Sequence, residues 1–238
     1  MTIRLVPVSS FNNPNLPIGD FSNPLARPDA LGIYSLLGPQ DESGNENHLT
    51  MGGHTFGPQG MVCTPVEGYF ADTGILEPDI FTVVVAHNVA QPTATSAISS
   101  ALNEGTSPFT GHRFALTAAG LQSLSIGVTP GSYFIQGGNA YGGWTAYAYT
   151  VSGKTLTIQR SSGQQFTGTA GETLTKRQAV ATTCIGGTKI PAAASICLPP
   201  NGIIGAWAMY AGDYGVGGRA QLINDTRTLM ARRGVTIP

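Results

Sequence analysis

The sequence predicts an all-β protein, an antiparallel β-sandwich of the jelly-roll type. Short apolar segments that alternate with a period of two recur along most of the chain, at the spacing of roughly 8–12 residues that sandwiches show. Glycine supplies 32 of the 238 residues and separates many of these segments, as turns between strands require. No long helical segment lies between them.

Composition excludes several classes of protein. Only 11% of the residues are charged, against about 25% in ordinary soluble domains, so a coiled coil is excluded. The net charge of −1 and the lack of a basic stripe argue against a nucleic-acid partner. The longest apolar run, residues 202–212, is far shorter than the roughly 20 residues that cross a bilayer. We therefore expect no membrane insertion and folding in a cytoplasm.

The first 30 residues differ from the rest of the chain. They contain five prolines, Pro7, Pro14, Pro17, Pro24 and Pro28. Proline removes hydrogen-bond donors from strands and blocks helix interiors. We predict an extended N-terminal arm over residues 1–30, which either lies on a neighbouring surface or leads into the first strand, and a sandwich domain over residues 31–238.

The strands follow from local alternation. Residues 81–86 form a β-branched apolar run, which is typical of a central strand. In residues 154–160, Leu156 and Ile158 share one face, and the preceding Ser152-Gly153 pair predicts a hairpin turn. The other predicted strands are residues 112–118, 121–128, 132–136, 144–151, 165–167, 177–185 and 203–211.

Two segments have helical character. Residues 95–104 predict a weak helix or a loop, and residues 218–233 predict an amphipathic helix packed on the sandwich. The apolar face of the second helix consists of Leu222, Ile223, Thr226, Leu229 and Met230. Arg232 and Arg233 suit the negative end of a helix dipole, and Gly234 suits a left-handed cap.

Charges are missing from two long stretches, residues 80–103 and 114–153. Uncharged strands are usually buried on both faces or covered by another subunit. We therefore predict a homo-oligomer, with a trimer favoured. The alternative is that serine, threonine and glutamine alone solvate the outer faces.

Residues 33–50 contain the pattern D-x-S-G-N-x-N-x-L, which runs from Asp41 to Leu49. This pattern resembles the opening of concanavalin A-like, laminin G-like sandwich modules, in which a strand enters an Asp/Ser/Gly/Asn turn. The later order of a tryptophan-led strand, a tight turn, a final strand and a short helix is also similar. The ending LMARRGV resembles the tail of such modules in tailed-bacteriophage virion proteins. Residues 199–202, PPNG, replace the acidic pair that precedes the last strand in that family.

The resemblance implies a non-enzymatic component of a bacteriophage virion, assembled in the host cytoplasm. The first hypothesis is a tail tip or fibre protein that contacts other virion proteins and the host surface or its glycans. The second is a capsid decoration or tail-assembly protein without a ligand. The third is a carbohydrate-active enzyme, which would need paired carboxylates. Glu77 and Asp79 are close in sequence, but Pro78 between them marks a turn.

Tyr141 and Trp144 are the candidate ligand-binding residues. They lie in a glycine-rich loop that includes Gly142 and Gly143. Aromatic rings offer flat apolar area that stacks on a sugar ring. The alternative is that Trp144 is a core residue of its strand, while Tyr147 and Tyr149, on the opposite face, are expected to pack in the core or in an interface.

Asp41, Asn45 and Asn47 are a candidate cation site, because oxygen-bearing side chains alternate there as at the start of a calcium loop. The bidentate glutamate expected at the twelfth position is replaced by Gly52. An Asx-rich turn, in which these side chains bond the nearby backbone, is the alternative.

The remaining candidates for chemistry are the cysteines. Cys63, Cys184 and Cys197 lack the spacing of a zinc site. We expect buried thiols, with a Cys184–Cys197 disulfide as the alternative. No P-loop, G-x-G-x-x-G or G-x-S-x-G motif occurs, so no cofactor is expected.

Overall fold

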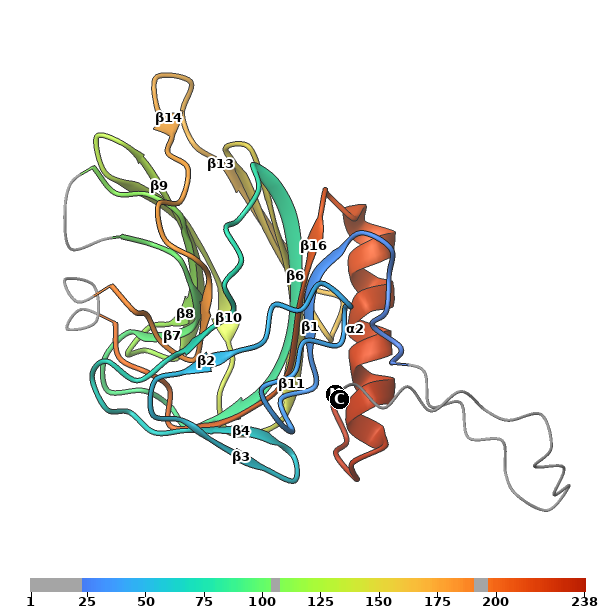
Figure 1. Ribbon diagram of the computed structural model, residues 1–238. Helices are drawn as coiled ribbons and strands as arrows, with labels where there is room; N and C mark the ends of the chain where they lie inside the picture. Colours follow the sequence, from blue (N-terminus) through green and yellow to red (C-terminus); the bar gives the residue numbers. More distant parts are fainter. Residues whose placement is uncertain (1–22, 104–107, 191–196) are drawn as a thin grey trace, which may run out of the picture.

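Two antiparallel β-sheets pack face to face, and a C-terminal helix lies on the outer side of one of them (Figure 1). This computed structural model describes residues 23–103, 108–190 and 197–238. The predicted β-sandwich is confirmed. Most of the predicted N-terminal arm, residues 1–22, lies outside the described residues, so the arm stays a prediction.

The first sheet, sheet A, contains the longest strands of the fold. Its strands are β1 (Ala30–Tyr34), β3 (Thr55–Gly57), β4 (Gly60–Cys63), β6 (Ile80–Val89), β11 (Thr145–Ser152), β12 (Thr155–Arg160), β13 (Gln165–Thr169) and β16 (Gly202–Ala211). Their order is β13-β12-β11-β6-β16-β4-β3, and β1 pairs with the second half of β16. The long apolar runs predicted at 81–86 and 203–211 are therefore neighbours at the centre of the sheet.

The second sheet, sheet B, includes several very short strands. They are β2 (Thr50–Met51), β5 (Ala71–Asp72), β7 (Ser96–Ser100), β8 (His112–Leu116), β9 (Leu121–Thr129), β10 (Ser132–Asn139), β14 (Thr175–Lys176) and β15 (Cys184–Ile185). Their order is β10-β9-β8-β7-β15-β5-β2, and β14 pairs with β9. The helix predicted as one possibility at 95–104 is wrong, because the strand β7 occupies five of these ten residues. Serine and alanine have little intrinsic preference for strands. The strand conformation of β7 is decided by its pairing with β8 and β15.

Only the last two residues of the predicted strand 177–185 are a strand. Residues 177–183 form a connection, in which the Arg177 amide donates to the Gly127 carbonyl and the Thr183 amide donates to the Ile75 carbonyl. These bonds replace the ladder that a strand would make.

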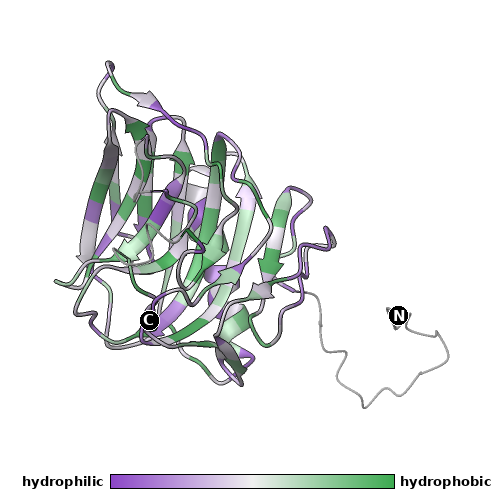
Figure 2. Ribbon diagram, turned by 60° about the vertical axis from the view of Figure 1, so that its left-hand side comes forward, coloured by the Kyte–Doolittle hydropathy of each residue, from purple (hydrophilic) through white to green (hydrophobic). Residues whose placement is uncertain are grey.

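The main core lies between the two sheets. Its apolar side chains come from strands in which apolar and polar residues alternate (Figure 2). Aromatic rings dominate it. Phe114 of sheet B stacks on Tyr149 of sheet A with ring centroids 4.9 Å apart, and Tyr34 meets Trp207 at 5.8 Å. Leu156 and Ile158, the two residues predicted to share one face, are both fully buried here.

Sheet A has small side chains on its other face. The outward alanines are Ala86, Ala146, Ala148, Ala206 and Ala208. Because these side chains are short, the helix α2 (Gly215–Ala231) packs directly on them (Figure 1). In residues 144–151 the large side chains of Tyr147 and Tyr149 therefore lie in the core between the sheets, and the small side chains of Ala146 and Ala148 lie under α2.

The predicted amphipathic helix is confirmed, with its whole apolar face buried. It begins at Gly215, three residues before the predicted start. Asp213 accepts hydrogen bonds from the Gly215 amide at 2.8 Å and from Arg219 Nη1 at 3.1 Å, which stabilises a first turn that is rich in glycine. Gly234, with φ of +71°, follows the C-terminal end as predicted.

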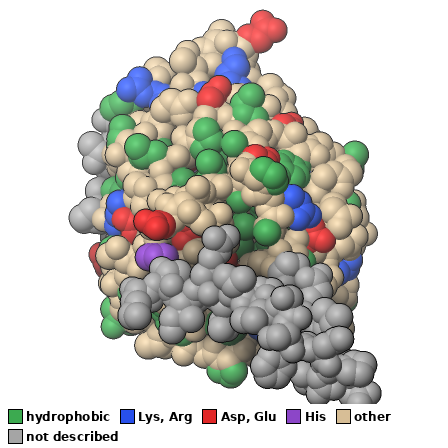
Figure 3. Space-filling model, turned by 45° about the vertical axis from the view of Figure 1, so that its right-hand side comes forward, with side chains coloured by type: hydrophobic (Ala, Val, Ile, Leu, Met, Phe, Trp, Pro, Cys, Tyr) green, Lys and Arg blue, Asp and Glu red, His purple; other side chains and the backbone are tan. Residues whose placement is uncertain are grey.

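Helix α2 also changes the interpretation of the missing charges. The uncharged strands β6 and β11 are covered on their outer face by α2 of the same chain, so no second subunit is required there. On sheet B, Ser123 and Ser125 of β9 are buried as well. The face in Figure 3 carries few and scattered charged side chains among uncharged ones.

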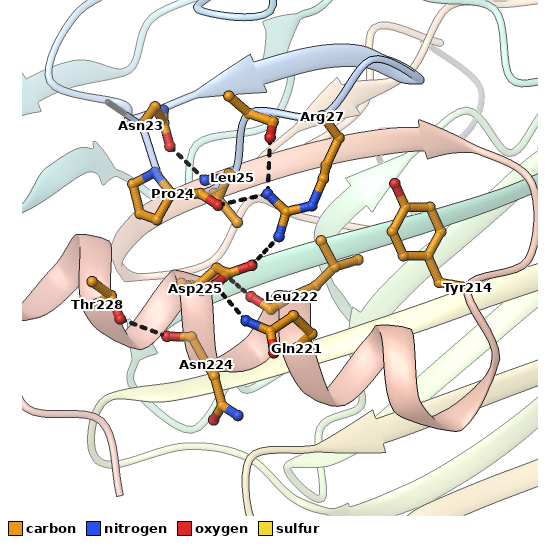
Figure 4. Close-up of polar contacts among 12 residues, drawn as sticks. Asn23, Pro24, Leu25, Arg27, Tyr214, Gln221, Leu222, Asn224, Asp225 and Thr228 are labelled. Carbon is orange, nitrogen blue, oxygen red and sulfur yellow. Dashed lines mark hydrogen bonds and ion pairs between the residues drawn. The ribbon is translucent and has the colours of Figure 1, made fainter. Parts of the chain in front are cut away.

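Residues 23–29 tie the start of the domain to α2 (Figure 4). Arg27 Nη1 donates to the carbonyl oxygens of Pro24 at 2.9 Å and Ala26 at 2.8 Å, and Arg27 Nη2 pairs with the Asp225 carboxylate on the helix. Leu25 is completely buried against the helix cluster. This segment therefore belongs to the folded domain, although it falls within the predicted arm.

The three cysteines, Cys63, Cys184 and Cys197, are buried thiols, and the alternative Cys184–Cys197 disulfide is wrong. Burial raises the pKa of Cys63 and of Cys184 to about 12, so both stay protonated at neutral pH. In the part of the chain that the structure describes, no helix is long and apolar enough to span a membrane.

Candidate functional site

Tyr141 and Trp144 line the same surface pocket, with a volume of about 270 Å³. The loop 139–145 forms one side of it, the turn 160–162 forms another, and Tyr147 and Pro238 complete the lining. Ligand pockets commonly measure about 300–1,000 Å³. The space therefore suits a single ring such as one sugar unit.

The loop that carries Tyr141 is fixed by its backbone. Ala140 N donates to Gly120 O, and Gly142 N donates to Val89 O, both at 3.1 Å. Gly142 has φ of +79°, a left-handed conformation that glycine adopts without strain. The Tyr141 ring lies against Gly120, where a Cβ would come within 2.1 Å of the ring. Tyr141 is thereby held with 39% of its surface exposed.

Trp144 is half-buried and contacts both the helix cluster and the pocket. It packs beside the helix cluster, and its ring lies over Gly205 of β16, where a Cβ would be 2.7 Å from the indole and 2.4 Å from Met230 Cε. The same residue lines the pocket. The packing of Trp144 agrees with the core interpretation, and its place in the pocket lining leaves ligand binding as a prediction.

The polar part of the pocket is built by Arg160 and Tyr147, which face each other across β11 and β12. Arg160 Nη2 donates to Asn139 O at 2.8 Å, and Nη1 donates to Gln164 Oε1 at 3.2 Å. Burial raises the pKa of Tyr147, while the nearby Thr145, Arg160 and Gln122 side chains oppose that rise. The Tyr147 hydroxyl makes no hydrogen bond of ordinary geometry to the described residues.

The sequence predicts that Tyr147 packs in the core or in an interface, and it gives no signal for Arg160 on its own. The Tyr147 ring does pack in the core, against Phe114 and His87. The signal that could have found the pair was the hairpin: counting outward from the Ser152-Gly153 turn places residue 147 opposite residue 160. Only the tertiary structure shows that the end of this hairpin meets the aromatic loop.

Asp41, Asn45 and Asn47 lie together in one turn, but their groups are used to hold that turn. Asp41 Oδ1 accepts from the amides of Ile33 and Ser43, and Oδ2 accepts from the Ser43 hydroxyl and the Asn47 amide, at 2.8–3.1 Å. The side-chain amides of both asparagines donate to backbone carbonyls at the start of β1, those of Ala30 and Leu31. These bonds are those of the Asx-rich turn. The residues described contain no cluster of three His, Cys, Asp or Glu side chains that could hold a metal.

A second pocket, of about 430 Å³, borders this turn. Residues 28–31, Asn45, Asn47 and Ile75 line it, and no aromatic side chain is among its described lining residues. It is the larger of the two, yet it lacks a flat apolar surface for a ring. We therefore take the Tyr141–Trp144 pocket as the candidate site.

Glu77 and Asp79 do not form a catalytic pair. Glu77 is buried in the core, where its Oε2 accepts from the His112 amide at 3.1 Å and from His112 Nδ1. Asp79 is exposed and pairs with Lys176 at 3.1 Å. Glu77 and Asp79 thus lie in different environments on either side of Pro78, which removes the pair that the enzyme hypothesis used.

No family model matches the sequence, and no curated protein matches it. Several solved structures are similar to the structure of this chain. Domain 4 of AbnA, an extracellular GH43 arabinanase from Geobacillus stearothermophilus solved with arabinotriose, superposes with a TM-score of 0.58 and 17% identity, over 82% of this chain and 98% of that one. The CBM40 of a Ruminococcus gnavus IT-sialidase, bound to α2,3-sialyllactose, gives 0.52 and 15%, over 68% and 96%.

A Trypanosoma rangeli sialidase gives a TM-score of 0.62 at 11% identity, over 86% of this chain but 34% of the sialidase. At these identities the likeness shows the fold alone. The chain thus has the lectin-like β-sandwich fold found in carbohydrate-binding modules and in sialidase sandwich domains.

Proposed function

We propose that this protein is a glycan-binding module that acts without catalysis and that its site is the Tyr141–Trp144 pocket. The observation that carries the proposal is the placement of two aromatic rings beside an arginine and several hydroxyl groups in a pocket of one-ring size. Such rings bind the apolar face of a sugar, while polar groups at the rim bind its hydroxyls. The modules with a similar fold include ones solved with bound oligosaccharides.

The chemistry of the pocket favours binding over hydrolysis. Glycoside hydrolysis uses two carboxylates that flank the scissile bond. No Asp or Glu is among the described residues that line this pocket. The sugar would therefore be held but not cleaved.

A glycan array followed by calorimetry tests the proposal. We expect the protein to bind at least one class of glycan and Tyr141→Ala to weaken that binding about tenfold, because a stacked ring contributes about 0.5–1.5 kcal/mol beyond the area it buries. Tyr141→Phe keeps the ring and should retain binding. Phe134→Ala is the matched control, since Phe134 is an aromatic residue of β10 with 55% exposure outside the pocket. Wild-type protein that binds no glycan would overturn the proposal.

We propose that the glycan lies on a host surface and that the protein is a component of a bacteriophage tail tip or fibre, organised as a trimer. This placement rests on the resemblance of residues 33–50 and of the C-terminal sequence to tail-protein modules. A capsid or tail-assembly role without a ligand is the alternative. The native mass in solution tests the trimer, and the position of the protein in particle images separates tail from capsid.

A further inference from the structure

Building on the proposed function, we propose that the pocket selects an acidic sugar and that Arg160 receives its carboxylate. Arg160 brings a positive charge to the pocket. Four other cationic side chains, those of Arg27, Lys176, Lys189 and Arg219, are paired with carboxylates. No described Asp or Glu side chain forms an ion pair with Arg160, which bonds instead to neutral oxygens of Asn139 and Gln164.

Hydrogen bonds hold the Arg160 guanidinium in place and leave some of its N–H donors unused. Two of its five N–H groups are used in the bonds to Asn139 and Gln164. The close approach of Gly138 also confines it, because a Cβ at Gly138 would lie 2.5 Å from Nη1. A planar, fixed guanidinium with unused donors matches the two oxygens of a carboxylate, and the bonds between them are charge-assisted.

The buried hydroxyl of Tyr147, next to Arg160, offers a further donor to an anion in the pocket. The Tyr147 hydroxyl is buried, lies near Arg160, and has no partner of ordinary geometry among the described residues. Buried polar groups are nearly always satisfied. A carboxylate oxygen of a ligand in the pocket can accept from Tyr147, which lines it.

The geometry of the guanidinium is the reason for assigning a carboxylate. Two parallel N–H donors of Arg160 can bond the two oxygens of a planar carboxylate at once, in a pocket that Tyr141 and Trp144 also line. We therefore assign the ligand class as uronic or sialic acids, and binding of sulfated sugars in their place would overturn the assignment.

The test compares each acid with its own methyl ester, which keeps the shape and removes the charge. The probes are a galacturonic acid trimer and 3′-sialyllactose, each with its methyl ester, together with a sulfated galactose. We expect calorimetry to show one acid bound at least about tenfold more tightly than its ester, because hydrogen bonds to charged groups are the strong ones. Raising the salt concentration should weaken the binding of the acid and leave that of the ester unchanged.

Variants separate the acid assignment from the proposed function. Arg160→Gln should remove the preference for the acid, and Arg177→Gln, a cation outside the pocket, should keep it. Tyr147→Phe keeps the buried ring and deletes a hydroxyl that has no hydrogen bond of ordinary geometry to the described residues, so it should keep the fold and still reduce the preference. Acid and ester bound equally, with Tyr141→Ala weakening both, would overturn the acid assignment and leave the proposed function standing. No binding of any glycan would remove both.

Discussion

Arg27 and Asp225 are 198 residues apart in the sequence and form an ion pair that joins the segment before β1 to helix α2 (Figure 4). The two side chains are 29% and 14% exposed, so solvent screens the pair only in part. Asp225 Oδ1 also accepts from Gln221 Nε2 at 2.8 Å, which fixes the carboxylate on the helix. The pair therefore holds the helix to the segment that leads into sheet A.

A double-mutant cycle measures this pair. Arg27→Ala and Asp225→Ala should each lower the free energy of unfolding, with a coupling energy of about 1 kcal/mol, because a partly buried charge-assisted bond exceeds the value of an exposed pair. Urea unfolding of the wild type, the two single variants and the double variant gives the coupling. Additive effects would show that the two side chains stabilise the fold independently.

Gly205 should tolerate no side chain, because Trp144 and Met230 fill the space beside it. We expect Gly205→Ala to lower the free energy of unfolding by about 1–3 kcal/mol, as overpacking does, and to change the tryptophan fluorescence. Gly171→Ala is the control, since a Cβ there meets nothing within 4 Å. Equal stability of the two variants would contradict the packing of Trp144 against β16.

His87 should make stability depend on pH. Burial lowers its pKa to about 3, below the value of about 6.5 for an exposed imidazole. The unfolded chain therefore gains a proton as the pH falls below about 6.5, while the folded protein does not, so stability is lost from about pH 6.5 downward.

His87→Phe tests this directly, because phenylalanine keeps the stack on Tyr147 and cannot be protonated. Between pH 7 and pH 5 the wild type should lose about 2 kcal/mol more stability than the variant, as linkage requires. A smaller slope should persist in the variant, since burial also lowers the pKa of His54. Parallel stability curves for the two proteins would refute the assignment.

Gly217→Ala should stabilise the protein. Gly217 is exposed in the first turn of α2, and a Cβ there would meet nothing within 4 Å. Alanine loses less backbone entropy than glycine in a helix, so the gain should be about 0.5–1 kcal/mol. Thermal unfolding checks this, and a fall in the melting temperature would show that the first turn needs glycine.

The strands and the helix could be predicted from local pattern because each has a period that the sequence repeats. Leu156 and Ile158 alternate with polar residues and share one face as expected, and that face lies in the core. The strand at Ser96–Ser100 could not be predicted, because its small residues carry no period and its neighbours in the sheet supply the preference.

The sequence by itself determined the pleated, glycine-punctuated sandwich, the amphipathic helix and the two aromatic residues of the loop 139–145. Only the tertiary structure decided that α2 covers the alanine face of sheet A and that the loop meets Arg160 and Tyr147. The physical reason is that periodicity determines which face of its own element a side chain lies on. A pocket, or the packing of a helix on a sheet, requires segments distant in sequence to come together. That depends on the packing of the whole chain.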